Sequence, residues 1–271
     1  MGWFIWNGVD SRTMGVVVAK YPPVVYPAER AETTEVPGRS GFLTVTQGSH
    51  VYSGYLKTIE IGNYRAADHQ RIAAWLRGSG TLVLGSEPDY VYQARVIKEA
   101  SLDRRMRGVY AGAVGFFVQP EKSRMPPEGP VAWTAPTPGE EPETTAFPTL
   151  WNPGDVPAKP KITVSATSQG AGVGPVIVIG IGTEAVTAGN GVPRIRVNLE
   201  ARPTLTGCVI DLAAMTVTTT DGAENLNAYT TVLNAETEDL WIPPRESRMV
   251  SWIEDGINMA SVSIEPRWRW L

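Results

Sequence analysis

The 271-residue chain contains one cysteine and two histidines, and this shortage limits the chemistry that it can perform. Cys208 alone cannot form an internal disulfide or a cysteine-based zinc cluster, and the scarcity of cysteine fits assembly in a reducing cytoplasm. His50 and His69 are too few for a three-histidine metal site and lack the spacing of metallohydrolase ligands. No Ser-His-Asp set or nucleophile elbow is indicated. We therefore predict a protein that is not an enzyme and that uses no cofactor and no metal ion.

Long apolar runs and a strong excess of charge are missing as well. No apolar stretch approaches the roughly 20 residues of a membrane helix, and residues 1–10 do not resemble a secretory signal. The formal net charge of −4 argues against a general nucleic-acid-binding protein. Hydrophobic residues make up 42% of the chain, which excludes wholesale disorder. We expect a globular protein with no membrane partner and no sequence-specific nucleic-acid partner.

Proline, in contrast, is abundant and unevenly distributed. Eight of the 22 prolines lie within residues 120–148, where missing backbone donors and fixed φ angles oppose pairing in a sheet. Residues 1–124 carry 15 basic against 11 acidic residues, whereas residues 125–271 carry 9 against 17. The change in the sign of the charge supports two separate units.

These patterns predict an N-terminal domain at 1–124, a proline-rich linker at 125–148 and a C-terminal domain at 149–271. Trp133 and Phe147 inside the linker suggest that parts of it dock on a neighbouring surface. Free disorder of the linker is the alternative, and the sequence leaves it open.

The first domain is predicted to combine antiparallel strands with one helix. The helix covers 66–77, with Ile72 and Leu76 on its apolar face and Gly78 as a left-handed cap. Gln47-Gly48 is expected to join two strands as a hairpin, and Glu87-Pro88-Asp89 is expected to form a turn. The predicted strands are 3–6, 15–19, 41–46, 51–61, 81–84, 90–96 and 109–118.

The second domain is predicted to be a β-sandwich. Short β-rich runs alternate with turn signals such as Asp221-Gly222, and no helical period of useful length lies between them. The predicted strands are 161–164, 176–181, 194–199, 207–211, 216–219, 247–252 and 260–269.

Glycine-rich segments in this domain superficially resemble dinucleotide-binding loops. Gly170–Pro175 has a proline where the fingerprint requires glycine, and it precedes a strand instead of a helix. Gly180-Ile181-Gly182 fails for the same reason. Both are therefore predicted to be turns.

Two further clusters have a functional and a structural interpretation. Arg104, Arg105 and Arg107 form the densest basic group, which either keeps a strand edge soluble or provides a strip that faces an anion or a protein. Trp241 and Trp252 belong to a group of tryptophans near the end of the chain. Aromatic clusters hold sugars but also fill sandwich cores, so a carbohydrate-binding host-adhesion module remains the alternative function.

The order of motifs resembles that of the distal tail (Dit) proteins of long-tailed bacteriophages. The similarity in the first domain begins with Phe4–Ser11 and Met14–Val18, continues through a Pro-Gly-Arg-x-Gly segment at Pro37, Gly38, Arg39 and Gly41, and then follows Tyr52–Tyr55, Trp75–Gly78 and Tyr90–Ala94. In the second domain it continues with Trp151–Ile162, Ile210-Asp211, Asp221–Asn227, Ser251-Trp252 and Ile264–Arg269. The motifs are collinear over nearly the whole chain.

The resemblance implies a structural virion component at the tail tip. The N-terminal domains would form a homohexameric ring, and the C-terminal domains would be galectin-like sandwiches. The implied partners are other copies of the chain, the tail tube protein and the tail-associated (Tal-type) protein, with receptor-binding or baseplate proteins beyond them. Six copies of the basic strip would then gather at one rim or in the lumen of the ring.

Overall fold

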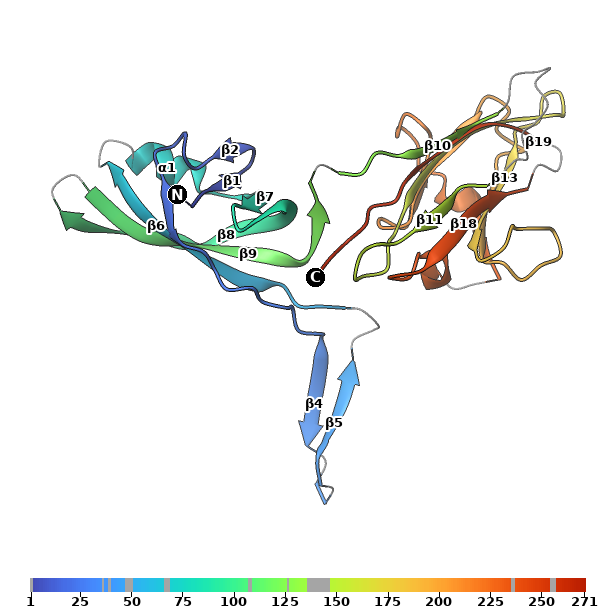
Figure 1. Cartoon of the computed structure of the whole chain (residues 1–271). Coiled ribbons are helices and arrows are strands. Elements are labelled where there is room, and N and C mark those ends of the chain that lie inside the picture. Colours follow the sequence, from blue (N-terminus) through green and yellow to red (C-terminus); the bar gives the residue numbers. More distant parts are fainter. Residues whose placement is uncertain are drawn as a thin grey trace. The chain divides into compact units, whose positions relative to one another are not determined.

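Two compact units make up the chain (Figure 1). Unit 1 comprises Met1–Pro126 together with Trp270–Leu271, and unit 2 comprises Pro127–Arg269. The computed structural model describes residues 2–35, 37–38, 40–46, 51–65, 69–106, 109–125, 127–135, 147–234, 237–253 and 257–271.

A seven-stranded antiparallel sheet forms the body of unit 1. Its strand order is β2-β1-β7-β8-β9-β6-β3, and its two longest strands, β8 and β9, are neighbours (Figure 1). The strands are β1 (Phe4–Trp6), β2 (Val9–Asp10), β3 (Val17–Lys20), β6 (Tyr55–Arg65), β7 (Ser79–Leu84), β8 (Glu87–Met106) and β9 (Val109–Arg124).

The turn between β1 and β2 follows directly from the sequence. Asn7 and Gly8 have φ angles of 51° and 79°, the left-handed values that a two-residue type I′ hairpin requires. The predicted strand-to-turn transition at Asn7-Gly8 is therefore confirmed.

A short helix, α1 (His69–Trp75), packs on one face of the sheet. Ile72 and Leu76 are buried, and the Trp75 indole donates a 3.1 Å hydrogen bond to the Trp6 carbonyl. Trp75 also stacks on Phe4 at 5.3 Å between ring centroids. Gly78 has the predicted left-handed conformation, with a φ of 76°, but it lies three residues beyond the last residue of α1.

Two predicted connections in unit 1 are wrong. Strand β5 (Phe42–Thr46) pairs with β4 (Ala31–Glu35), not with the strand that follows it, because Pro37-Gly38 turns the chain earlier. Gln47-Gly48 lies outside the described residues. The turn between β7 and β8 is Gly85-Ser86, and the predicted turn residues from Glu87 onward begin strand β8.

The last two residues of the chain belong to unit 1. Trp270 exchanges two backbone hydrogen bonds with Lys122 of β9, at 2.8 and 3.0 Å. Its indole packs edge-on against Tyr90 at 5.7 Å and is 8% exposed. Unit 1 is therefore discontinuous in sequence, with unit 2 inserted before its final residues.

Unit 2 is a sandwich of two five-stranded antiparallel sheets, ordered β10-β19-β12-β15-β16 and β11-β18-β13-β14-β17. The strands are β10 (Val131–Thr134), β11 (Thr149–Trp151), β12 (Lys161–Ser168), β13 (Val176–Gly182), β14 (Arg194–Asn198), β15 (Gly207–Asp211), β16 (Thr216–Thr218), β17 (Thr230–Leu233), β18 (Ser247–Trp252) and β19 (Ile257–Glu265). Two short 3₁₀ turns, Asn227–Tyr229 and Thr237–Leu240, precede β17 and β18.

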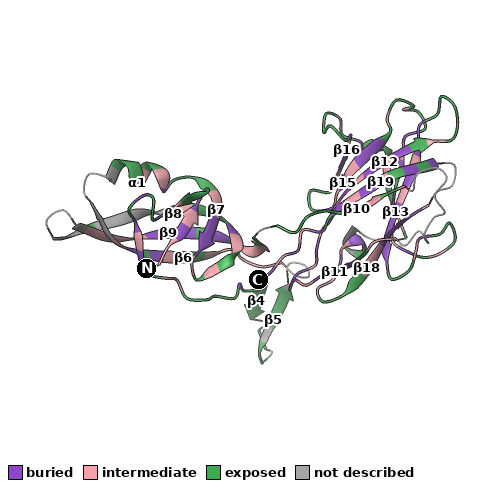
Figure 2. Cartoon of the chain, turned by 45° about the horizontal axis from the view of Figure 1, so that its top comes forward, coloured by how far each residue is buried: buried purple, intermediate pink, exposed green. Residues whose placement is uncertain are grey.

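Alternation along the strands builds the core between these two sheets. Ile162, Val164 and Ala166 of β12 are buried in alternation, and β13 contributes Ile177 and Ile179 from the other sheet. Figure 2 shows such buried positions recurring along the strands of unit 2. Period-two burial on both inner faces is what a sandwich requires.

The proline-rich segment contributes to this sandwich at both of its ends. Trp133 and Phe147 each pack against Trp252, at 4.7 Å between ring centroids, so the predicted docking is confirmed for these two residues. The prediction that the segment stays out of the sheets is wrong for β10, which pairs with β19. Val131–Thr134 contains no proline, and all its backbone donors are therefore available.

Glycines in unit 2 serve two different purposes. Gly172 has a φ of 75° within the predicted turn before β13. Gly180-Ile181-Gly182, in contrast, lies in β13, and its prediction as a turn is wrong. A Cβ atom at Gly180 would lie 2.6 Å from Cβ of Val186, so this glycine allows close packing inside the sandwich.

Candidate functional site

Unit 1 exposes apolar side chains on the sheet face opposite its core. Leu56 of β6 and Phe117 of β9 are register partners, and they are 47% and 38% exposed. Ile97 of β8 is 56% exposed. Because Phe116 and Val118 are buried on the other face, the alternation directs Phe117 outward. We call Leu56, Ile97 and Phe117 the apolar strip.

The β4–β5 hairpin forms a second exposed surface. All five residues of β4 are exposed, as are Leu43 and Val45 of β5 (Figure 2). The hairpin is a separate two-stranded sheet, which leaves it without a hydrophobic core of its own.

The Pro-Gly-Arg-x-Gly positions connect these two strands. Gly38 and Gly41 have φ angles of 81° and 90°, and this backbone conformation explains why glycine occupies both positions. Pro37 lies in the same turn, and Arg39 lies outside the described residues. The correspondence of these positions to the Dit motif stays a prediction.

The predicted basic strip is only partly within the described structure. Arg104 and Arg105 lie in β8, where Arg104 is the register partner of Tyr110 in β9. Arg107 lies outside the described residues. The ladder between β7 and β8 reaches only to Arg95, so in the described structure this end of β8 pairs with β9 alone. An anion- or protein-facing role stays a prediction.

A buried ionic cluster lies at one end of the core of unit 1, and the sequence analysis did not identify it. Glu87 lies 3.5 Å from Lys57 and 3.1 Å from Lys122, and it accepts a 2.7 Å hydrogen bond from the Tyr92 hydroxyl. Lys57 is 2% exposed. Its ammonium also lies 4.7 Å from the centroid of the Tyr92 ring, within cation–π range.

Burial and charge act in opposite directions on the carboxyl group of this cluster. Burial raises the pKa of Glu87, but hydrogen bonds from Tyr92 and Lys122 and the two lysine charges outweigh it, so the pKa lies below its ordinary value. Burial lowers the pKa of Lys57, and Glu87 offsets part of this effect. Burial and the bond to Glu87 raise the pKa of Tyr92. Glu87 therefore carries its charge at neutral pH.

The depressed pKa of Glu87 predicts loss of stability in acid. A carboxyl group whose pKa falls on folding stabilises the protein above its unfolded pKa, and this contribution disappears as the pH falls through the folded pKa. Urea unfolding between about pH 7 and about pH 3 should therefore show a smaller decline with acid in Glu87→Gln than in the wild type. Glu60→Gln, at an exposed position of β6, should keep the wild-type dependence. An equal decline in the wild type and Glu87→Gln would contradict this prediction.

The tryptophans considered for sugar binding do not form an open platform. Trp252 is 2% exposed. Trp241 is half-buried, and the Lys159 ammonium lies 4.1 Å from the centroid of its ring. The burial of Trp252 removes the motivation that this indole gave to a carbohydrate-binding function.

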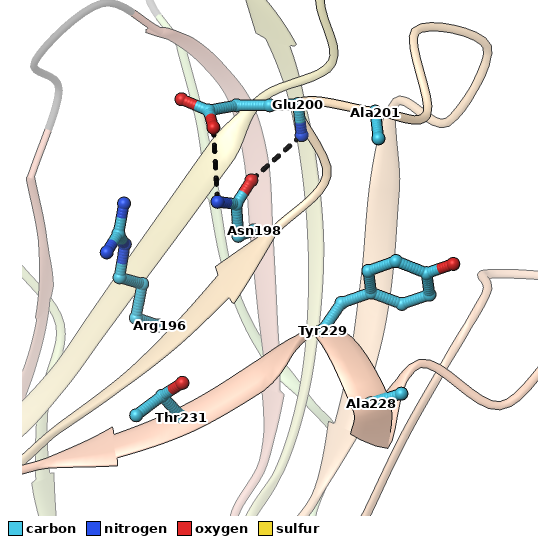
Figure 3. A pocket seen from close by; sticks show the side chains of 7 residues that line it. All are labelled: Arg196, Asn198, Glu200, Ala201, Ala228, Tyr229 and Thr231. Atoms are coloured by element: carbon cyan, nitrogen blue, oxygen red, sulfur yellow. Dashed lines mark hydrogen bonds between the residues drawn. The ribbon is translucent and has the colours of Figure 1, made fainter.

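A polar pocket of about 350 Å³ opens on unit 2 beside β14 and β17 (Figure 3). Arg196 and Thr231 are register partners on these strands, and both are exposed. The Asn198 amide donates to the Glu200 carboxylate at 3.2 Å and accepts from the Glu200 backbone at 2.9 Å. In Figure 3, Arg196 and Tyr229 lie on opposite sides of Asn198.

No group of three or more His, Cys, Asp or Glu side chains in the described ranges is arranged to hold a metal ion. No helix among the same residues has the length and apolar character needed to cross a membrane.

Comparison with solved structures provides the decisive observation about the fold. The chain superposes on the crystal structure of SPP1 Dit (gp 19.1) with a TM-score of 0.66, 13% sequence identity and complete coverage of both chains. That protein is described as a paradigm of the hub adsorption apparatus in phages that infect Gram-positive bacteria. This chain has a Dit-like fold.

The predicted fold class is thereby confirmed. The Dit-like fold is mainly β, with a strand-rich unit 1 that carries a helix and a galectin-like sandwich as unit 2. No family model and no curated protein sequence matches the chain. At 13% identity the likeness establishes the fold, and the Dit-like motif residues named above keep the status of predictions.

Proposed function

We propose that this chain is a structural protein of a bacteriophage tail tip. As a homohexameric ring, it would connect the tail tube to the tail-associated and host-adhesion proteins after assembly in the host cytoplasm. The observation that carries the proposal is the likeness to a hub adsorption-apparatus protein over the full length of both chains. The role is structural, and unit 1 forms the ring.

The surface of unit 1 supports its place in an assembly. The apolar strip and the exposed apolar residues of β5 give unit 1 a hydrophobic surface in contact with water. Such a surface is typical of a protein that binds a partner. Head-to-tail contacts between copies close into a ring when a whole number of equal rotations completes a full turn. The strip is the part of unit 1 that we expect to become covered.

Native mass spectrometry of the full chain tests the proposal. We expect a hexamer at micromolar concentration, and we expect Phe117→Glu to weaken association by at least about tenfold, because a carboxylate would enter an apolar contact. Val173→Glu, which places the same charge at an exposed apolar position of unit 2, should leave the hexamer intact. A wild-type chain that stays monomeric, both alone and with purified tail tube protein, would refute the ring.

A further inference from the structure

The polar pocket beside β14 and β17 has no part in the proposed ring, which belongs to unit 1. Arg196 and Asn198 alternate with the buried Ile195 and Val197, so they point away from the sandwich core. The following loop supplies Glu200, and the turn before β17 supplies Tyr229. We propose that this pocket binds a neutral sugar, one hexose unit of a carbohydrate.

The balance of charge in the pocket favours an uncharged ligand. Arg196 offers only donors, and its side chain is exposed. Glu200 offers only acceptors, and its second carboxylate oxygen is not used by the Asn198 bond. The Glu200 carboxylate would repel an anionic ligand, and the Arg196 guanidinium would repel a cationic ligand. A sugar hydroxyl both donates and accepts, and therefore suits both residues.

The acceptor side of the pocket is already held in position. Asn198 binds both the carboxylate and the backbone N–H of Glu200, as the dashed lines in Figure 3 show. A fixed carboxylate loses less conformational entropy when a ligand binds. Asn198 is therefore a positioning residue, and Glu200 is the expected contact to adjacent hydroxyl groups.

Tyr229 supplies an aromatic surface on the opposite side. Tyr229 is 36% exposed, and the Arg202 guanidinium lies 5.7 Å from its ring centroid and donates a 3.4 Å hydrogen bond to its hydroxyl. Arg202 is itself paired with Glu224, so the ring is held by an anchored neighbour. The C–H groups of a sugar ring are apolar and pack against an aromatic ring while the hydroxyl groups bind the polar side.

The size of the pocket matches one sugar unit better than a long chain. Its volume of about 350 Å³ falls at the lower end of small-molecule sites, roughly 300–1,000 Å³. An open site of this size with few contacts binds weakly, with an expected dissociation constant in the millimolar range. Repeated copies in an assembly would raise the overall affinity without any new contact.

Saturation-transfer difference NMR on the full chain tests this proposal. The probes are glucose, galactose, mannose and N-acetylglucosamine, with glucuronate and glucosamine as charged counterparts of the same ring. We expect at least one neutral sugar to bind more tightly than both charged ones. Arg196→Met and Tyr229→Ala should each weaken that binding by about tenfold or more.

Two controls separate loss of the site from loss of the fold. Arg77→Met removes the same charge from an exposed position of unit 1 and should leave sugar binding unchanged. Unfolding midpoints of all variants should stay close to that of the wild type, because the altered side chains are exposed. Absence of binding by every neutral sugar would overturn the proposal, as would a preference for a charged probe. Equal binding by wild type, Arg196→Met and Tyr229→Ala would also overturn it. A hexamer without sugar binding would leave the proposed function standing.

Discussion

Replacing Glu87 with alanine is expected to destabilise unit 1 by about 3–5 kcal/mol, the loss typical of breaking a buried ion pair from one side. The change leaves the buried Lys57 and the partly buried Lys122 without their carboxylate, and it removes the acceptor of the Tyr92 hydroxyl. Urea unfolding, followed by hydrogen exchange of peptides from unit 1, measures the loss. A decrease below about 1 kcal/mol would contradict the importance of the cluster.

Two further variants give this experiment its controls. Glu60→Ala also removes a glutamate from unit 1, but the side chain of Glu60 is 54% exposed and lies 3.7 Å from Lys20, so the expected change stays within about 0.5 kcal/mol. Adding Lys57→Met to Glu87→Ala should recover part of the lost stability, because an apolar side chain of similar length replaces the uncompensated cation. If stability does not recover, the unpaired Lys57 is not the cause of the destabilisation in Glu87→Ala.

Removal of Trp270 and Leu271 should also destabilise unit 1, by about 3–5 kcal/mol. The truncation takes away a buried indole that packs on Tyr90, together with two backbone hydrogen bonds to Lys122. The expected result is faster hydrogen exchange in β8 and β9, with the exchange of unit 2 unchanged. Deletion of Leu271 alone is the matched control and should have little effect, because Trp270 keeps its backbone and ring contacts.

The opposite result would be equally informative about the C-terminal residues. If both truncations leave the exchange of β8 and β9 at the wild-type rate, the pairing with Lys122 contributes nothing to unit 1. Trp270→Ala, which keeps the backbone, then separates the indole from the two hydrogen bonds. We expect this variant to show most of the loss of stability, because burial of an aromatic side chain contributes more than two backbone hydrogen bonds.

Strand positions were predictable where β-branched residues recur along a buried strand. β12 and the first half of β13 combine β-branched residues with alternating burial, and their positions follow from the sequence. β4, with the sequence AETTE, was not predicted because it is exposed throughout and carries no hydrophobic pattern. β17 was missed for a similar reason, since two of its four residues are exposed.

The ionic cluster of unit 1 illustrates what one sequence cannot provide. Glu87 was assigned to a turn because proline follows it, whereas its partners Lys57 and Lys122 are 30 and 35 residues away. Only the pairing of β6, β8 and β9 brings the three together. One local signal was available, because Lys57 shares its strand face with the buried Ile59 and Ile61. A lysine in that register predicts a buried partner of opposite charge.

The sugar pocket was hidden for a related reason. Arg196 and Asn198 alternate with apolar residues and look like the solvated side of an ordinary strand. They line a pocket only together with Tyr229, which directly precedes β17. More than 30 residues separate β14 from β17 in the sequence, and the pairing of these strands brings the pocket residues together. Trp241 and Trp252 attracted attention instead, and the sandwich uses Trp252 in its core.

The position of unit 2 inside the sequence of unit 1 has an evolutionary consequence. Both ends of unit 2 leave from the same end of one sheet, because β10 and β19 are antiparallel neighbours and Glu128 accepts a hydrogen bond from the Trp268 indole. Insertions with adjacent termini are the ones that a host domain tolerates. Recombination at two junctions, near Pro127 and Arg269, could therefore exchange the entire sandwich as a cassette while Trp270 keeps its place beside β9. Such an exchange would replace all of unit 2 and leave the residues of unit 1 unchanged.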